Sequence, residues 1–204
     1  THIPQAVGAA LTAKMKKEDR VIMAYFGDGA SSAGDCHEAM NFAAIHTLPV
    51  IFFCENNGYA ISVPLSKQMA VDNVAGRAEG YGMPGIEIDG CDIVAVYETT
   101  VEAVARARTG LGPTLIEANV ERYLPHTSDD DDSIYRSSQE IEEAKKRDPL
   151  RLLREQLLER KILNLKEDKY IHESAKEIVN KATEEAENAP YPETTDFFKH
   201  VYAE

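Results

Sequence analysis

The sequence predicts an α/β protein with a doubly wound parallel sheet, followed by a helical C-terminal tail. Short apolar runs typical of buried strands alternate with helical patterns along the first part of the chain. Two of these runs, residues 21–26 and 50–54, enclose a helical pattern at 35–47. A strand, a helix and a second strand in this order form a parallel pair, whose carboxyl ends meet at one edge of the sheet.

Local signals define the other elements of this region. Asp92 is well placed to cap a helix, because its side chain can accept hydrogen bonds from the free amides of the first turn. The expected elements are a helix at 3–17, a loop at 58–64, a short helix at 71–80, a strand at 85–90, a helix from 92 to 109 and a strand at 114–118. Because the chain opens directly on a helix, we expect a further N-terminal segment in the full protein.

The character of the chain changes after the last of these strands. Residues 119–138 have no periodicity and include an acidic run at 129–132, which favours a long polar loop. Helical patterns follow at 140–146, from Pro149 onward and at 166–187, with a short closing segment at 197–198. We assign residues 1–138 to the α/β domain and 139–204 to a helical extension that packs on that domain or on a partner.

Composition excludes several classes of function. The chain has 204 residues and a net charge of −13, which disfavours binding to nucleic acids or to an anionic membrane surface. No apolar run approaches the ~20 residues that a membrane-spanning helix needs. The three cysteines, Cys36, Cys54 and Cys91, lack metal-site spacing, which favours buried thiols in a reducing, cytoplasmic compartment.

Two short motifs follow the paired strands and carry the chemistry. Gly27-Asp28-Gly29 comes after the first strand, and Asn56-Asn57 ends the second. Asp28 and Asn57 offer hard oxygen ligands, which suit Mg²⁺. Gly29 and Ala30 can present main-chain N–H groups to an anion beside a helix start. Either motif alone is a weak signal, but their combination across a strand–helix–strand unit predicts a diphosphate held through Mg²⁺.

The stretch from Gly27 to Asn57 resembles the thiamin-diphosphate motif, and the sequence around it is more specifically similar to one family. Residues 53–62 and 122–127, together with Tyr135-Arg136, are similar to the alpha subunit of the decarboxylating component of branched-chain 2-oxo acid dehydrogenases. The resemblance covers essentially the whole chain. It implies a sheet of the thiamin-diphosphate-binding type, with residues 1–138 as the domain that binds thiamin diphosphate and Mg²⁺.

The resemblance also implies roles for individual positions. The side chains of Asp28 and Asn57 and the main-chain carbonyl of Tyr59 would bind Mg²⁺. His126 would lie near the diphosphate and the reacting carbon, where an imidazole can assist proton transfer. The positions expected to contact the cofactor are Gly27, Gly29, Ala30 and His126.

The implied activity is the oxidative decarboxylation of a branched-chain 2-oxo acid, with transfer of the acyl group to a lipoyl-bearing acyltransferase. The cofactor would lie between this chain and a beta subunit in an α2β2 assembly, so this chain alone should be inactive. The alternatives are a pyruvate or acetoin dehydrogenase alpha subunit, a transketolase-like enzyme, and a non-catalytic scaffold subunit. One departure bears on the last: Glu55 stands where some relatives have an arginine that neutralises diphosphate charge.

A second group of polar residues favours a structural interpretation. Asp35, Cys36, His37 and Glu38 include potential metal ligands, but adjacent side chains on a helix point in different directions. We expect Asp35 to act as the N-cap of the helix that follows.

Overall fold

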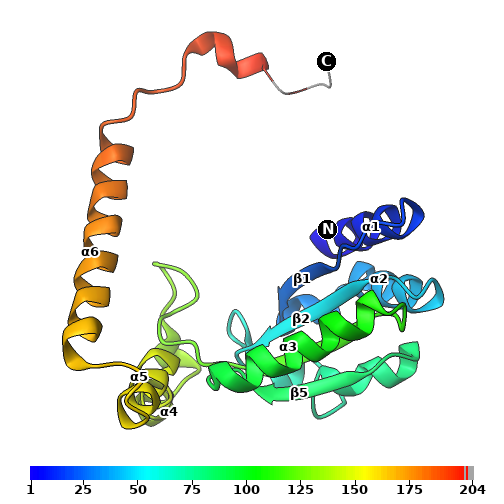
Figure 1. Cartoon of the computed structure of the whole chain (residues 1–204), viewed down its shortest axis with the longest axis horizontal. Helices are drawn as coiled ribbons and strands as arrows, with labels where there is room; N and C mark the ends of the chain where they lie inside the picture. The colour runs from blue at the N-terminus through cyan, green and yellow to red at the C-terminus, as the bar shows by residue number, and fades with distance from the viewer. Residues whose placement is uncertain (200, 202–204) are drawn as a thin grey trace. The chain divides into compact units, whose positions relative to one another are not determined.

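A computed structural model describes residues 1–199 and 201 of the chain. Within these residues the centre of the α/β region is a four-stranded parallel sheet with the order β1-β2-β6-β5 (Figure 1). In the sheet register Gly27 lies opposite Glu55, and Asn56 lies opposite Asn119. The carboxyl ends of three neighbouring strands therefore meet at one edge. The strands are β1 (Ile22–Gly27), β2 (Val50–Asn56), β5 (Gly85–Asp89) and β6 (Thr114–Asn119).

Helices cover both faces of the sheet, as a doubly wound sheet requires. Val50, Phe52 and Cys54 share one apolar cluster with residues of α1, α2 and the 3-10 helix η3. Ile51 and Phe53 point to the opposite face, where they pack with residues of α3. Alternating side chains of β2 thus serve both faces, which explains its continuous apolar run. The helices are α1 (His2–Met15), α2 (Gly34–Ile45), η3 (Ala75–Tyr81) and α3 (Ile93–Arg108).

The chain divides into two compact units, Thr1–Leu153 and Arg154–Glu204. After β6 the elements are the 3-10 helix η4 (Asp132–Ile134) and the helices α4 (Ser138–Lys145), α5 (Pro149–Glu159), α6 (Leu165–Glu187) and η5 (Thr194–Phe198). In the second unit a capping box of Asn164 and Glu167 starts α6. In the part of the chain that the structure describes, no helix combines the length and apolarity needed to cross a bilayer.

Several predicted elements are confirmed, and three need correction. The side chain of Asp92 accepts hydrogen bonds from two amides at the start of α3, as expected of an N-cap. Asp35 is not an N-cap: α2 begins at Gly34, and Asp35 lies inside its first turn, where an acid still favours the positive end of the helix dipole. The loop expected at 58–64 contains two short antiparallel strands, β3 (Tyr59–Ala60) and β4 (Val63–Pro64), and the short helix at 71–80 is the 3-10 helix η3.

The predicted division at 138/139 and the thiamin-diphosphate-binding type of sheet stay predictions. Residues 200 and 202–204 of the 139–204 extension lie outside the described residues.

Candidate functional site

Asp28 is a deeply buried carboxylate at the edge where the strands end. It is the first residue of the 3-10 helix η1 (Asp28–Ser32), which directly follows β1, and it is 1% exposed. Its Oδ2 accepts a hydrogen bond of 2.8 Å from Nε2 of Gln68. Among the described residues, no lysine, arginine or histidine forms an ion pair with Asp28. Burying a carboxylate without a counter-charge is costly, so this position suits a bound cation.

The two asparagines at the end of β2 fold the chain into a tight turn. Oδ1 of Asn56 accepts a hydrogen bond of 2.8 Å from the amide of Gly58, and Oδ1 of Asn57 accepts one of 3.1 Å from the amide of Tyr59. Gly58 has a φ of +80°, a conformation that glycine adopts without strain. The turn fixes the backbone at Tyr59, and with it the carbonyl that the sequence analysis assigns to Mg²⁺.

Glu117 of β6 holds this turn in place through a hydrogen bond with Asn56. It is completely buried, and its Oε1 accepts a hydrogen bond of 2.6 Å from Nδ2 of Asn56. Its Oε2 accepts another of 2.6 Å from the main-chain amide of Ala75. One carboxylate therefore ties the end of β2 to the start of η3. The signal for it in the sequence is a lone acid inside an apolar strand, which the sequence analysis did not use.

The segments that carry the two motifs touch each other at Gly29. A Cβ at this position would lie 2.7 Å from Cβ of Ala60, which leaves no room for a side chain. At Gly27 a Cβ would meet only the main-chain oxygen of Glu55, at 3.8 Å. The structure thus brings the turn that holds Tyr59 and Ala60 against the segment that starts at Asp28.

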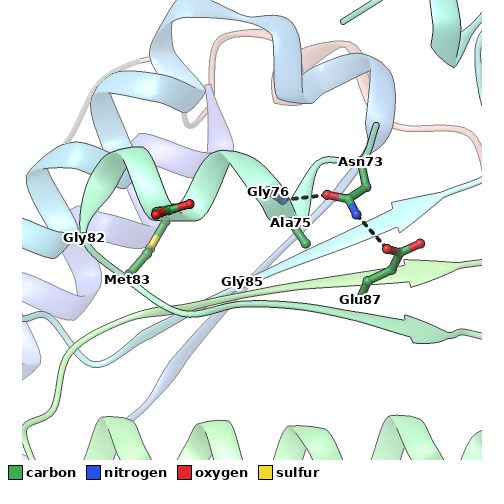
Figure 2. Close-up of a pocket in the computed structure, with 8 residues that line it drawn as sticks. Asn73, Ala75, Gly76, Gly82, Met83, Gly85 and Glu87 are labelled. Atoms are coloured by element: carbon green, nitrogen blue, oxygen red, sulfur yellow. Dashed lines mark hydrogen bonds between the residues drawn. The ribbon is translucent and has the colours of Figure 1, made fainter. Parts of the chain in front are cut away.

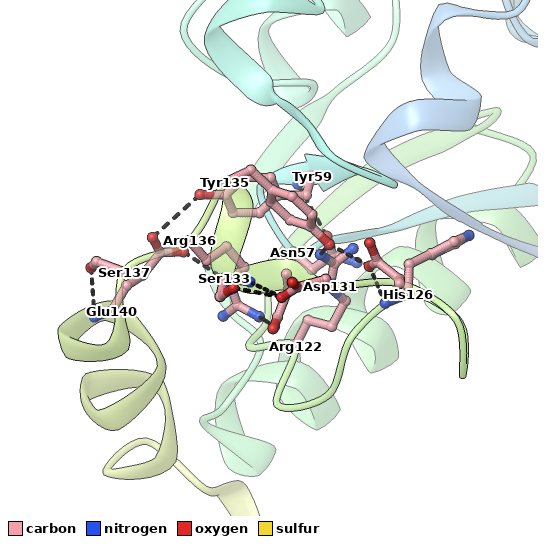
Figure 3. Close-up of polar contacts among 12 residues, drawn as sticks. Asn57, Tyr59, Arg122, His126, Asp131, Ser133, Tyr135, Arg136, Ser137 and Glu140 are labelled. Atoms are coloured by element: carbon pink, nitrogen blue, oxygen red, sulfur yellow. Dashed lines mark hydrogen bonds and ion pairs between the residues drawn. The ribbon is translucent and has the colours of Figure 1, made fainter.

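His126 lies in the exposed loop that follows β6, and its backbone is held by a chain of hydrogen bonds (Figure 3). Oδ2 of Asp130 accepts a hydrogen bond of 2.8 Å from the amide of His126 and one of 2.5 Å from the hydroxyl of Tyr135. The same hydroxyl accepts one of 2.9 Å from Nη2 of Arg122. The loop therefore has a defined backbone, while the imidazole of His126 is exposed.

The same loop is joined to the asparagine turn through Tyr59. Nη1 of Arg122 donates a hydrogen bond of 2.8 Å to the carbonyl of Ile61. The guanidinium groups of Arg122 and Arg136 lie 5.5 Å and 5.7 Å from the centre of the Tyr59 ring, within the range of cation–π attraction. The rings of Tyr59 and Tyr135 lie 5.6 Å apart, centre to centre. These contacts bring the loop that carries His126 to the turn that carries Asn57.

Charge and burial set the protonation of this cluster. Burial, and then the hydrogen bond of 3.3 Å to Glu140, raise the pKa of the Tyr59 hydroxyl. The hydrogen bond from the Tyr135 hydroxyl, and then the one from the amide of His126, lower the pKa of Asp130. At neutral pH the Tyr59 hydroxyl is therefore neutral and donates a hydrogen bond to Glu140. Asp130 is ionised and accepts the hydrogen bonds from the Tyr135 hydroxyl and the amide of His126.

Comparison with known proteins identifies the family. The model of the family described as dehydrogenase E1 component matches residues 1–195. The chain belongs to this family. It is 51% identical over 203 residues to the 2-oxoisovalerate dehydrogenase subunit alpha of Bacillus subtilis, 43% over 204 residues to the 3-methyl-2-oxobutanoate dehydrogenase subunit alpha of Mycobacterium tuberculosis, and 45% over 205 residues to the mitochondrial 2-oxoisovalerate dehydrogenase subunit alpha of Homo sapiens.

These matches include all of this dehydrogenase E1 chain, but only 62%, 56% and 46% of the three relatives. The chain thus spans about half of the length of the curated relatives it matches. The resemblance to branched-chain dehydrogenase alpha subunits, expected from the motifs, is confirmed by this similarity.

In this dehydrogenase E1 chain, Glu55 stands where some relatives have an arginine, and it lies on the face of the sheet opposite to that of Asn56. Its side chain is exposed and alternates with that of Asn56, so it points to the α3 face of the sheet. There it lines an open, largely apolar cavity of about 500 Å³ together with Tyr25 and Tyr97. Asn56, in contrast, points to the face that holds Glu117.

A second cavity, of about 430 Å³, lies beside η3 and β5 (Figure 2). Two of its polar residues are held by hydrogen bonds within the chain: Asn73 donates one of 2.7 Å to Oε2 of Glu87 and accepts one of 2.7 Å from the amide of Gly76. The described residues contain no group of three or more His, Cys, Asp and Glu side chains placed to hold a metal ion. The predicted ligand set has one carboxylate, one amide and one main-chain carbonyl, so it is not a group of three His, Cys, Asp or Glu side chains, and the absence of such a group does not bear on it.

Proposed function

We propose that this chain is the cofactor-binding part of the alpha subunit of a branched-chain 2-oxo acid dehydrogenase that depends on thiamin diphosphate and Mg²⁺. The relatives named above support the class of reaction. The observation that carries the proposal is the buried Asp28, which has no cationic partner among the described residues and lies at the edge where the Asn57 turn ends β2. When bound, thiamin diphosphate would supply the carbon nucleophile and the electron sink for decarboxylation.

The residues present fit this group. Asp28, Asn57 and the carbonyl of Tyr59 would hold Mg²⁺, and the ion would offset the charge of the buried carboxylate. Gly29 has no side chain, and this lets the turn that carries Tyr59 and Ala60 pack directly against the segment that starts at Asp28. Gly27, Gly29 and Ala30 would contact the diphosphate, in keeping with the preference of main-chain N–H groups for anions.

His126 would hold or move a proton at the edge of this site. An imidazole can exchange a proton near neutral pH, and the loop holds the backbone of His126 through Asp130 while its side chain is exposed. An exposed proton-transfer group fits a site that a second subunit completes. We propose that a beta subunit covers it in an α2β2 assembly and that a lipoyl-bearing acyltransferase accepts the acyl group.

Calorimetric titration tests the cofactor site. Thiamin diphosphate would be titrated, with and without Mg²⁺, into this chain co-expressed with its beta subunit. We expect saturable binding that requires Mg²⁺ and that Asp28→Ala abolishes. Glu55→Gln is the matched control: it removes an exposed carboxylate at the end of the neighbouring strand and should bind as the wild type does.

Assays with 3-methyl-2-oxobutanoate and pyruvate then test the substrate class. A higher kcat/KM for the branched substrate supports the proposal, and a preference for pyruvate would identify a pyruvate dehydrogenase alpha subunit. If a well-folded assembly binds no cofactor, the chain is a scaffold subunit and the proposal is wrong.

A further inference from the structure

Gln68 holds the buried Asp28, and its amide has a fixed orientation. Its Nε2 donates hydrogen bonds of 2.8 Å to Oδ2 of Asp28 and 3.0 Å to the carbonyl oxygen of Val63. Both partners are acceptors only, so the NH₂ group must face them and the oxygen must face the other way. Gln68 was not predictable as a partner of Asp28, because the two residues lie 40 positions apart along the chain.

The oxygen of this amide has no protein partner. Oε1 of Gln68 is buried and forms no hydrogen bond within the described residues. Leaving a buried acceptor unsatisfied destabilises the folded state, so the position calls for a donor from outside the chain. The atom lies 4.0 Å from the place that a Cβ of Gly29 would occupy, and thus beside the backbone expected to approach the diphosphate.

We propose that Gln68 is a positioning residue of the metal site, with a separate task for each end of its amide. Nε2 engages Oδ2 of Asp28 and so orients the carboxylate that binds the ion. Oε1 accepts a hydrogen bond from a water molecule that the ion carries. Mg²⁺ usually retains water in its coordination shell, and groups that hold the ligands of an ion commonly change its affinity 10–100-fold. This inference rests on the proposed function, because it needs an ion at Asp28.

Metal affinity, rather than turnover, provides the test. Mn²⁺ would replace Mg²⁺, and its free concentration would be followed by electron paramagnetic resonance in the assembly with the beta subunit and saturating thiamin diphosphate. Gln68→Met keeps the length of the side chain but removes both polar groups, and should raise the Kd for Mn²⁺ about 10–100-fold. Gln156→Met, at an exposed position of α5, is the control and should leave the Kd unchanged.

Gln68→Glu separates a positioning role from a purely structural one. It restores an acceptor, so it should bind Mn²⁺ more tightly than Gln68→Met. It also places a second carboxylate beside Asp28, so its thermal midpoint should rise more on metal addition than that of the wild type. If Gln68 only joined η1 to the neighbouring segment, each variant would have a lower thermal midpoint than the wild type, by the same amount with and without metal.

The outcomes distinguish the two proposals. If Gln68→Met binds Mn²⁺ as the wild type does while Asp28→Ala does not, the role of Gln68 is wrong and the proposed function stands. If the wild-type assembly itself binds no Mn²⁺ and cofactor, both are wrong. Should Gln68→Met fail to assemble, Gln68→Glu decides: a Kd and a metal-dependent rise in midpoint equal to those of the wild type would overturn the inference.

Discussion

The two glycines on either side of Asp28 differ in the space around them, and this gives a matched pair of substitutions. Gly29→Ala puts a methyl group 2.7 Å from Cβ of Ala60, so the turn at Tyr59 must move. We expect a loss of about 1–3 kcal/mol in the free energy of unfolding and much weaker cofactor binding. Gly27→Ala meets only one atom, at 3.8 Å, and has an ordinary φ of −83°, so it should fold with the stability of the wild type. Urea unfolding compares the stability of the two variants and calorimetry measures the cofactor binding of Gly29→Ala; equal stability of the two variants would contradict the packing argument.

Replacing Glu117 should destabilise the two segments that its carboxylate joins, the end of β2 and the start of η3. Glu117→Ala leaves the side-chain amide of Asn56 and the main-chain amide of Ala75 without their acceptor in a buried place. We expect the free energy of unfolding to fall by roughly 3–5 kcal/mol. Glu117→Gln keeps one acceptor oxygen, so its loss should be smaller, roughly 1–3 kcal/mol. The exposed neighbour Glu55→Gln should change stability by no more than about 0.5 kcal/mol. Equal stability of all three variants in urea would exclude a structural role for Glu117.

At the scale of elements, the loop between β6 and α4 depends on the hydroxyl of Tyr135. This group accepts a hydrogen bond from Arg122 and donates one to Asp130, which in turn holds the amide of His126. Tyr135→Phe removes both bonds but keeps the ring against Tyr59. We expect faster hydrogen exchange at residues 126–135 and a lower kcat, with little change in global stability.

Tyr191→Phe is the matched control for this loop, because that tyrosine is 95% exposed. It should leave exchange at 126–135 unchanged. If Tyr135→Phe also exchanges at the wild-type rate, the hydroxyl does not order the loop.

The elements were predictable where local chemistry decides them. The apolar runs became the strands of the sheet, Asp92 caps α3, and Pro149 starts α5. The N-cap assigned to Asp35 was wrong, because the N-cap of α2 is Ala33, two residues earlier than the polar pattern indicates. The hairpin of β3 and β4 was missed, because each strand has two residues and no alternation can be read over such a length.

At the scale of the whole molecule, sheet topology made part of the candidate site predictable. Parallel pairing of β1 with β2 was enough to bring Asp28 and Asn57 to one edge. The groups that hold them were not predictable, because Gln68 and Glu117 reach their partners across 40 and 61 residues of chain. Such contacts leave no periodic signal. Whether His126 acts on a substrate stays a prediction, because its side chain is exposed at the surface that a partner is expected to cover.

The three buried thiols report on the integrity of the molecule as a whole. Cys36, Cys54 and Cys91 are free and buried, and burial is the largest cause of the raised pKa of each thiol. Because the thiolate is the reactive form, iodoacetamide at pH 8 should label the native chain far more slowly than the unfolded chain. Mass spectrometry along a urea series should show labelling that follows global unfolding.

The pH dependence of stability gives the same thiols a thermodynamic test. In the folded chain burial raises the pKa of Cys36 from 9.0 to about 11. The folded state therefore holds this proton more tightly than the unfolded state, and the contribution to stability is complete below pH 9 and is lost as the pH rises toward 11. We expect the urea midpoint to fall between pH 8 and pH 10.5, and to fall less in Cys36→Ala, which has no proton to lose there. An equal fall in that variant would show that other groups cause the loss of stability at alkaline pH and that the Cys36 thiol does not contribute to it.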